Sequence, residues 1–219
     1  MHSSGGITGI LSFTRRPVFY YITDRHQLPA QSIDALLDRI RRALSLGVDF
    51  VQLREKDLPD AELLALTRAT VRFAGGTKCR IIVNGRIDIA LAGRAHGVHL
   101  PSSGITSADL KPHLPRNFIM GVSAHSRPQA QRAAAGGADY ILLGPIFPTP
   151  SKLKYGKPLG LRRFGRICGA LTLPVLGLGG IRPDRIAEVL DAGAIGIAGI
   201  SLFQDELNLA AHNSWLTGR

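Results

Sequence analysis

The stretch Pro174–Ser201, PVLGLGGIRPDRIAEVLDAGAIGIAGIS, holds two short apolar runs with a helix-forming segment between them. Residues 174–178 and 195–201 are rich in small and β-branched apolar residues without polar alternation, which is typical of buried parallel strands. Each run ends in glycine or serine. Glycine lets the backbone approach a ligand, and a helix start exposes free N–H groups, so the two turns predict a phosphate-binding cup. In an eight-fold β/α barrel such cups follow strands seven and eight.

The preceding chain supplies six further strand–helix units. Strands are expected at residues 18–24, 49–54, 80–84, 97–100, 118–123 and 139–144, and helices at 32–46, 60–73, 86–92, 107–113, 127–135 and 161–170. A glycine that stops a helix two residues before a strand recurs at Gly47, Gly137 and Gly193. The pattern predicts a single-domain, TIM-type (β/α)8 barrel over residues 17–216, with a closing helix at 204–216 and a loose N-terminal arm at 1–16. A doubly wound open sheet is the alternative, although no GxGxxG follows the first strand.

Length and composition indicate one globular domain, because 45% of the 219 residues are hydrophobic and 20% are charged. The net charge of +11 fits either a basic surface or a site for anions such as phosphate. No run of five Lys or Arg occurs and aromatic residues are few, so we expect no nucleic-acid partner. We likewise expect no membrane partner, no signal peptide and a cytoplasmic location. Cys79 and Cys168 lack metal-ligand spacing and are expected to be core thiols.

Polar residues gather where the predicted strands end, which is where barrels carry their chemistry. Gln52 and Arg54 alternate and so face the same way. Arg54 either binds a ligand or pairs with Glu55 or Asp57 at the rim. Asn84 follows an apolar strand, where capping a turn is the simpler role.

A second group follows the fifth and sixth strands. Ser123 and His125 share a face, and a histidine there suits proton transfer, although a structural role is also open. His99 is expected to be a core or rim histidine. The 147–157 loop carries three lysines and several hydroxyl groups, so it is either a lid over an anion or a solvated basic loop.

Carboxylate pairs are missing from the same strand ends. No two Asp or Glu stand at adjacent ends after strands three to six, and Asp24 and Asp139 are single and far apart in strand order. A Mg²⁺ site built on carboxylates is therefore hard to assemble. No metal ligand is predicted.

Taken in order, these motifs resemble the thiamine phosphate synthase/TenI superfamily over about residues 18–203. The matching segments are YITD at 21–24, VQLREK at 51–56, IVN at 82–84, GVHL at 97–100, GVSAHS at 121–126, GADY at 137–140, GPIFPT at 144–149, Lys152, GGI at 179–181 and GIS at 199–201. The resemblance implies a β/α barrel that handles a thiazole phosphate.

Carried over by motif, the resemblance implies two groups of binding residues. Around the pyrimidine diphosphate of a synthase it places Gln52, Arg54, Lys56, Asn84, Ser123 and Lys152. Around the thiazole phosphate it places Thr149, Gly180, Ile200 and Ser201.

The departures from the pattern decide which branch the sequence favours. Synthases carry an Asn-Asp pair after strand three and a second Asp after the GVHL strand, and both aspartates bind Mg²⁺. Here those places read Asn84-Gly85-Arg86 and Leu100-Pro-Ser-Ser, which look like the TenI branch, the thiazole tautomerases. Losing the metal would remove several kcal/mol of help to a departing pyrophosphate.

The favoured expectation is therefore a metal-free, cofactor-free isomerase, in which His125 acts as general acid and base on a thiazole phosphate. The first alternative is thiamine phosphate synthase itself, a transferase that would use Mg²⁺, with Arg54, Lys56 and Lys152 as cations that partly replace the metal. Further alternatives are a non-catalytic binder of thiazole phosphate and another phosphate-handling barrel such as a sugar-phosphate epimerase. The expected partner is a small phosphate-bearing molecule, and a homodimer is possible.

Overall fold

Eight short parallel strands follow one another in a closed barrel, in the order β1 to β8. This confirms the predicted (β/α)8 fold and rules out the open sheet. The computed structural model describes residues 16–149 and 157–205. Its contacts divide into two compact units, which are described separately. The N-terminal unit holds residues 19–99 and 199–219, and the C-terminal unit holds residues 1–18 and 100–198.

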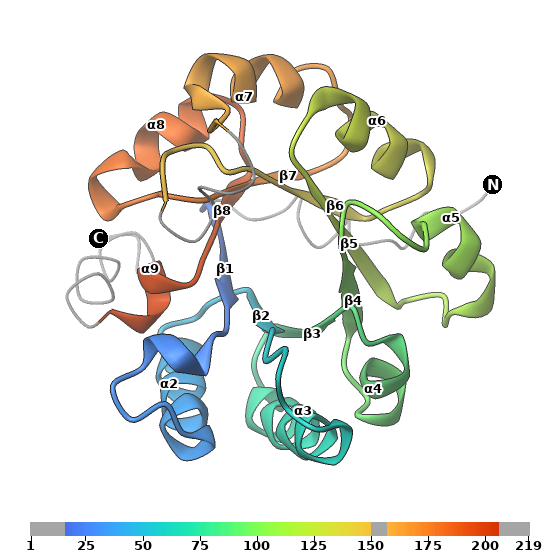
Figure 1. The fold of residues 1–219 in the computed structure, drawn as a ribbon, viewed down its shortest axis with the longest axis vertical. Coiled ribbons are helices and arrows are strands. Elements are labelled where there is room, and N and C mark those ends of the chain that lie inside the picture. The colour runs from blue at the N-terminus through green and yellow to red at the C-terminus, as the bar shows by residue number, and fades with distance from the viewer. Residues whose placement is uncertain (1–15, 150–156, 206–219) are drawn as a thin grey trace. The chain divides into compact units, whose positions relative to one another are not determined.

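In the N-terminal unit, helices lie outside the strands that they connect (Figure 1). Its elements are β1 (Val18–Ile22), the 3₁₀ turn η1 (Arg25–Gln27), α2 (Ile33–Ser45), β2 (Phe50–Leu53), α3 (Asp60–Ala74), β3 (Arg80–Asn84), α4 (Ile87–Ala92), β4 (Gly97–Leu100) and α9 (Ser201–Gln204). The register pairs Ile22 with Gln52 and Gln52 with Ile82. Residues about thirty apart in sequence are therefore neighbours at the carboxyl ends of these strands.

The C-terminal unit repeats the arrangement. Its elements are α5 (Ser107–Leu110), η2 (Lys111–His113), β5 (Ile119–Ala124), α6 (Arg127–Ala135), β6 (Tyr140–Leu143), α7 (Gly160–Cys168), β7 (Val175–Leu178), η4 (Pro183–Arg185), α8 (Ile186–Asp191) and β8 (Gly196–Gly199). Leu143 pairs with Gly177, and Gly177 pairs with Ile197.

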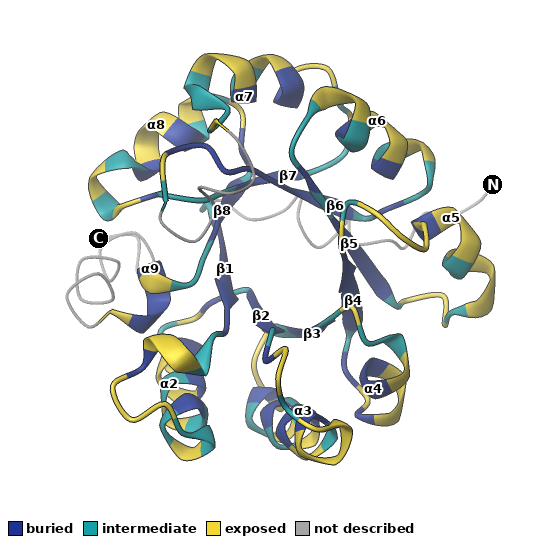
Figure 2. Ribbon diagram, in the orientation of Figure 1, coloured by how far each residue is buried: buried dark blue, intermediate teal, exposed yellow. Residues whose placement is uncertain are grey.

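Burial follows the layers of each unit. The strands are almost wholly buried, and the helices expose their outer faces (Figure 2). In α2, Leu36, Ile40 and Leu44 are buried at helical spacing, while Asp38 and Arg41 face solvent. Both cysteines are buried as expected, and burial raises the pKa of the Cys79 thiol to about 12 and that of Cys168 to about 11. No helix among the described residues is both long and apolar enough to cross a membrane.

The repeated helix stops have the backbone that the sequence predicts. Gly47, Gly137 and Gly193 have φ of 82°, 79° and 101°, a left-handed conformation that favours glycine. Each lets the chain turn at once from a helix into the next strand.

Some boundaries differ from expectation. The 107–113 helix splits into α5 and η2 because Pro112 has no N–H with which to continue an α-helix. Arg86 caps α4 rather than beginning it. Asp205, just after α9, is extended, so no continuous helix runs on from Gln204. The rest of the predicted closing helix, the N-terminal arm up to residue 15 and loop residues 150–156 lie outside the described residues.

Gly196→Ala is expected to prevent folding or to cost at least about 3 kcal/mol of unfolding free energy. A Cβ at Gly196 would lie 2.0 Å from the backbone oxygen of Val18, which cannot give way as a side chain could. Gly169→Ala is the matched control, because its Cβ would meet only ordinary contacts, the nearest at 3.5 Å. Urea unfolding of both variants measures the difference, and equal stabilities would contradict this packing.

Candidate functional site

The predicted site residues are distributed over both units. The N-terminal unit holds Gln52, Arg54, Lys56, Asn84, Ile200 and Ser201. The C-terminal unit holds Ser123, His125, Thr149 and Gly180, while Lys152 lies outside the described residues.

A chain of side-chain hydrogen bonds crosses the first three strands. The Tyr20 hydroxyl donates to Gln52 Oε1 over 3.0 Å, and Gln52 Nε2 donates to Asn84 Oδ1 over 2.9 Å. Gln52 is buried, and Asn84 is half-buried at the end of β3. These bonds fix which way the Asn84 amide points and leave its NH₂ group without an acceptor among the described residues. Asn84 is thus a pre-oriented donor.

The two carboxylates after β2, those of Glu55 and Asp57, form ion pairs with Arg25, which follows β1. Arg25 Nη1 and Nη2 contact the two oxygens of Asp57 at 2.8 and 2.5 Å, and Nη1 also lies 3.2 Å from Glu55 Oε2. Thr23 Oγ1 donates to Glu55 Oε1 over 2.6 Å, and His26 Nε2 lies 3.1 Å from Asp57. Arg25 holds the pKa of Asp57 well below its usual range. Both carboxylates are therefore paired with the same guanidinium, whose single positive charge offsets one of their two negative charges.

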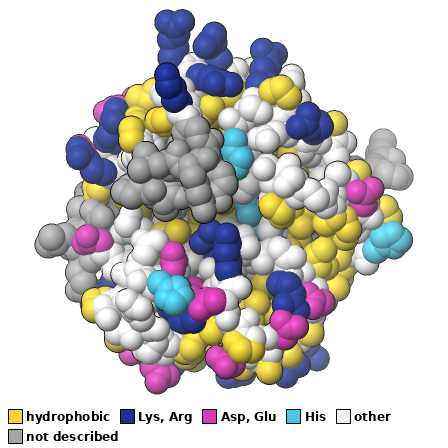
Figure 3. Space-filling view, viewed as in Figure 1, with side chains coloured by type: hydrophobic (Ala, Val, Ile, Leu, Met, Phe, Trp, Pro, Cys, Tyr) yellow, Lys and Arg dark blue, Asp and Glu magenta, His cyan; other side chains and the backbone are white. Residues whose placement is uncertain are grey.

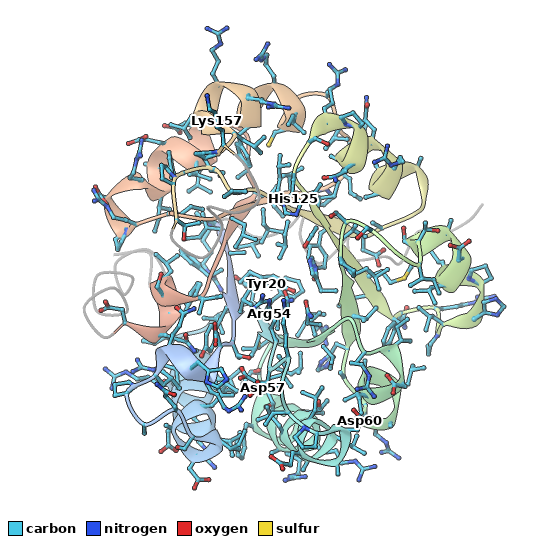
Figure 4. All side chains as sticks on the ribbon, in the orientation of Figure 1. Tyr20, Arg54, Asp57, Asp60, His125 and Lys157 are labelled. Atoms are coloured by element: carbon cyan, nitrogen blue, oxygen red, sulfur yellow. The ribbon has the colours of Figure 1, made fainter. Side chains whose placement is uncertain are left out.

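Arg54 consequently has no carboxylate partner in the described part of the chain. Its backbone N–H donates to Thr23 Oγ1 over 3.0 Å, but its half-buried guanidinium makes no hydrogen bond or ion pair with any described residue. In the view of Figure 4, Arg54 lies near the centre of the ring of strands, with Asp57 farther out toward the helices. Lys56 is exposed and likewise uncommitted within the described part of the chain. The open choice for Arg54 is thus decided against pairing with Glu55 or Asp57.

The carboxylates near the end of β3 belong to Arg86. Its Nη1 contacts Asp60, and its Nε and Nη2 contact Asp88 at 3.0 and 2.6 Å. The guanidinium lowers the pKa of Asp88 to about 2 and also lowers that of Asp60. This cluster lies at the solvent-exposed start of α4.

His99 is a buried core histidine, as expected, with only 2% of its surface exposed. Burial, and to a smaller extent the charge of Arg54, lowers the pKa of His99 to about 3. The imidazole is therefore neutral near neutral pH and adds no positive charge beside Arg54.

This burial predicts a pH-dependent stability. The folded pKa lies below the ordinary 6.5, so the contribution is complete above pH 6.5 and is lost as the pH falls toward 3. Between pH 8 and pH 5 we expect His99 to account for a loss of about 2 kcal/mol in unfolding free energy. Urea titrations across this range should show that loss in the wild type, and the His99→Gln variant should lack it. An equal loss in the variant would contradict the assignment.

In the C-terminal unit, His125 joins the ends of two strands. Its Nδ1 lies 2.5 Å from the carbonyl oxygen of Gly144, and its backbone N–H donates to Gln129 Oε1 over 2.7 Å. A carbonyl oxygen can only accept, so Nδ1 is the donor in this contact. This bond ties the end of β5 to the turn after β6. Ser123 is half-buried within β5.

The glycine turn after β7, where the sequence predicts a phosphate cup, has a left-handed backbone. Gly179 and Gly180 have φ of 94° and 67°, and a Cβ on Gly180 would lie 2.7 Å from Pro148 O. The N–H groups of Gly180 and Ile181 find no acceptor among the described residues. Thr149 ends the described part of the neighbouring loop. In the other unit, Ile200 precedes α9 and the exposed Ser201 begins it.

Other cations lie on the outer surface. Figure 3 shows Lys and Arg side chains projecting beyond the helical layer near α7, where Arg162, Arg163 and Arg166 are exposed. Arg185 instead stacks over the ring of Phe147, with 3.7 Å between its Cζ and the ring centroid. Part of the +11 charge is thus plain basic surface.

Magnesium does not fit the side chains at these strand ends. The described residues contain no cluster of three or more His, Cys, Asp or Glu arranged to hold a metal ion. Arg25 and Arg86 occupy the carboxylates that follow β2 and β3. Mg²⁺ prefers such oxygens, and here they already carry a positive partner.

Sequence reasoning missed Arg25 and Tyr20, and gave Thr23 no role beyond its place at the end of the first strand. Arg25 contacts residues 30 and 32 positions away, so its role depends on the register of β1 against β2. The signal in the sequence was Arg25 itself, a positive charge directly after Thr23-Asp24 at the end of the first strand. It could have been set against Glu55 and Asp57 once a parallel pairing was assumed.

Fold and side chains together define a (β/α)8 barrel. At the carboxyl ends of its strands, cations and an amide group have no hydrogen-bond acceptor among the described residues. A family model described as thiamine monophosphate synthase (TMP-TENI) matches residues 19–203. The chain belongs to the thiamine monophosphate synthase family.

Similar proteins carry the corresponding names. A putative thiamine-phosphate synthase of Geobacter sulfurreducens is 45% identical over 182 residues, which is 83% of this chain and 84% of that protein. A thiamine-phosphate synthase of Roseiflexus castenholzii is 40% identical over 186 residues, covering 85% and 80%. The solved thiamine phosphate pyrophosphorylase of Pyrococcus furiosus has a TM-score of 0.79 and 31% identity, covering 92% of this chain and 94% of that one.

These names correct the expected activity. The favoured isomerase, a TenI-like tautomerase with His125 as its acid and base, is wrong, because relatives at 40–45% identity are named as synthases. The error lay in treating the missing aspartates as decisive.

Proposed function

We propose that this chain is a thiamine-phosphate synthase, a transferase that joins hydroxymethylpyrimidine diphosphate to thiazole phosphate and releases pyrophosphate. The observation that carries the proposal is the half-buried Arg54, whose guanidinium has no partner among the described residues although two carboxylates, Glu55 and Asp57, follow it closely in sequence. An arginine left in this state suits a bound anion, and membership of the family makes a diphosphate the natural one.

The reaction needs charge stabilisation more than proton transfer. The bond between the pyrimidine methylene carbon and the diphosphate oxygen breaks, and its electron pair leaves with pyrophosphate. The thiazole nitrogen then supplies the electron pair of the new carbon–nitrogen bond. Negative charge grows on the leaving oxygens, where Arg54 and Lys56 would stabilise it. No step is assigned to a metal.

Binding roles follow for the remaining side chains. The Asn84 amide, oriented by Gln52 and Tyr20, would donate to the diphosphate or the pyrimidine. The N–H groups of Gly180 and Ile181 would bind the thiazole phosphate, with Thr149, Ile200 and Ser201 as further candidates. His125 is proposed to position the 144–149 turn through its bond to Gly144. Ser123 and Lys152 keep their proposed place near the pyrimidine diphosphate.

An omission assay tests the activity. Purified protein is incubated with both substrates, or with either one alone, and pyrophosphate release is followed with a coupled phosphatase. Release only when both substrates are present supports the synthase. No release, under conditions in which a known synthase turns over, refutes it.

A further inference from the structure

The charges at the strand ends of the N-terminal unit are sorted into two groups. Glu55 and Asp57 are closed off by one arginine, and Asp60 and Asp88 by another. Arg54 and Lys56 remain without partners among the described residues. Each of the four carboxylates is thus held by an arginine, whereas the two remaining cations have no described side chain to hold them.

The Glu55 carboxylate is buried, and its partners within the protein surround it. Only 1% of the Glu55 side chain is exposed, and its oxygens accept from Thr23 Oγ1, from the Arg25 backbone N–H and from the Arg25 guanidinium. A metal ion would have to displace Arg25 from this carboxylate, which would leave the guanidinium facing the ion. Like charges in a partly buried site make that exchange unfavourable.

The ends of β1, β4, β5 and β6 do not offer a substitute. The described segments after β4, β5 and β6, residues 101–106, 125–126 and 144–149, contain no Asp or Glu. Asp24, after β1, is a single carboxylate that accepts from Gln27 Nε2 over 2.9 Å. One carboxylate alone is a weak anchor for Mg²⁺, which then keeps most of its water.

We propose that the diphosphate site of this chain binds pyrophosphate without a divalent metal, through the guanidinium of Arg54 and the ammonium of Lys56. The proposal rests on the proposed synthase function for its choice of ligand. Arg54 supplies planar paired donors that match two phosphate oxygens, and Lys56 adds a second charge close in sequence. Neutral His99 does not contribute to the binding charge.

Calorimetric titration of inorganic pyrophosphate into the full-length protein tests this directly, once in EDTA and once in excess Mg²⁺. We expect binding in EDTA to be as tight as in Mg²⁺ or tighter, because magnesium removes charge from the free ligand. We also expect binding to weaken with added salt, as for any pair of accessible charges. Binding that is at least about tenfold tighter in Mg²⁺, or that is lost in EDTA, would overturn the proposal.

Single substitutions locate the site. Arg54→Gln and Lys56→Gln should each weaken pyrophosphate binding in EDTA by about tenfold or more. Arg42→Gln is the matched control, because Arg42 is an exposed arginine on α2 whose loss lowers the net charge equally. Equal weakening in all three variants would show non-specific attraction to a basic protein and would overturn the site.

The outcome is separable from that of the synthase assay. Metal-free pyrophosphate binding without turnover would refute the synthase and leave the binding site standing. Turnover together with metal-dependent pyrophosphate binding would do the reverse.

Discussion

Replacing Arg54 with glutamine is expected to lower kcat/KM for thiamine phosphate formation by about 100- to 1,000-fold. The guanidinium has no protein partner among the described residues, so its loss should weaken the binding of the diphosphate and leave the folded structure intact. The free energy of unfolding should therefore change by less than about 0.5 kcal/mol. Initial rates at varied diphosphate concentration, together with urea unfolding, measure both quantities.

Two further variants sharpen this test. Arg54→Lys keeps one charge but loses the planar pair of donors, so it should recover only part of the activity. Arg42→Gln should leave the rate within about twofold of the wild type, because screening weakens a distant surface charge. An Arg54→Gln variant with full activity, or one that unfolds, would assign Arg54 a different role.

Arg25→Gln is expected to lower the stability of the fold, whereas Arg54→Gln is expected to lower activity and leave stability nearly unchanged. It leaves the buried Glu55 carboxylate without its charge partner, which should cost about 3 kcal/mol of unfolding free energy. It also frees Glu55 and Asp57 beside Arg54, so pyrophosphate affinity should fall as these carboxylates turn to Arg54. Urea unfolding and calorimetry on the same preparation measure the two effects.

A double substitution identifies the cause. Adding Glu55→Gln to Arg25→Gln removes the unpaired charge and should recover about half of the lost stability or more. Arg25→Lys should be intermediate, because an ammonium cannot span both carboxylates as the guanidinium does. If Arg25→Gln were as stable as the wild type, the ion pairs of Arg25 with Glu55 and Asp57 would not contribute to the stability of the fold.

The barrel was predictable because its signals are local. A glycine such as Gly47, Gly137 or Gly193 stops a helix by its own backbone freedom, and the apolar run that follows needs no distant partner to be recognised as a strand. The 107–113 region shows the limit, since Pro112 divides a helix that composition alone leaves whole.

The site was predictable only in part because its contacts are not local. Sequence proximity left open whether Arg54 pairs with Glu55 or Asp57, whereas the strand register brings Arg25 to both. The same limit misled the choice of activity. Absent aspartates at Gly85 and after Leu100 are visible in sequence, but the lack of a described partner for the Arg54 side chain is visible only once its neighbours are known.

The most direct measurement is the identity and stoichiometry of the product. Wild-type protein is incubated with hydroxymethylpyrimidine diphosphate and thiazole phosphate, and thiamine phosphate and pyrophosphate are quantified together by chromatography and mass spectrometry. A synthase gives the two products in equal amounts, and Arg54→Gln gives little of either. Consumption of the thiazole phosphate without thiamine phosphate, or no reaction where a known synthase succeeds, would contradict the proposed function.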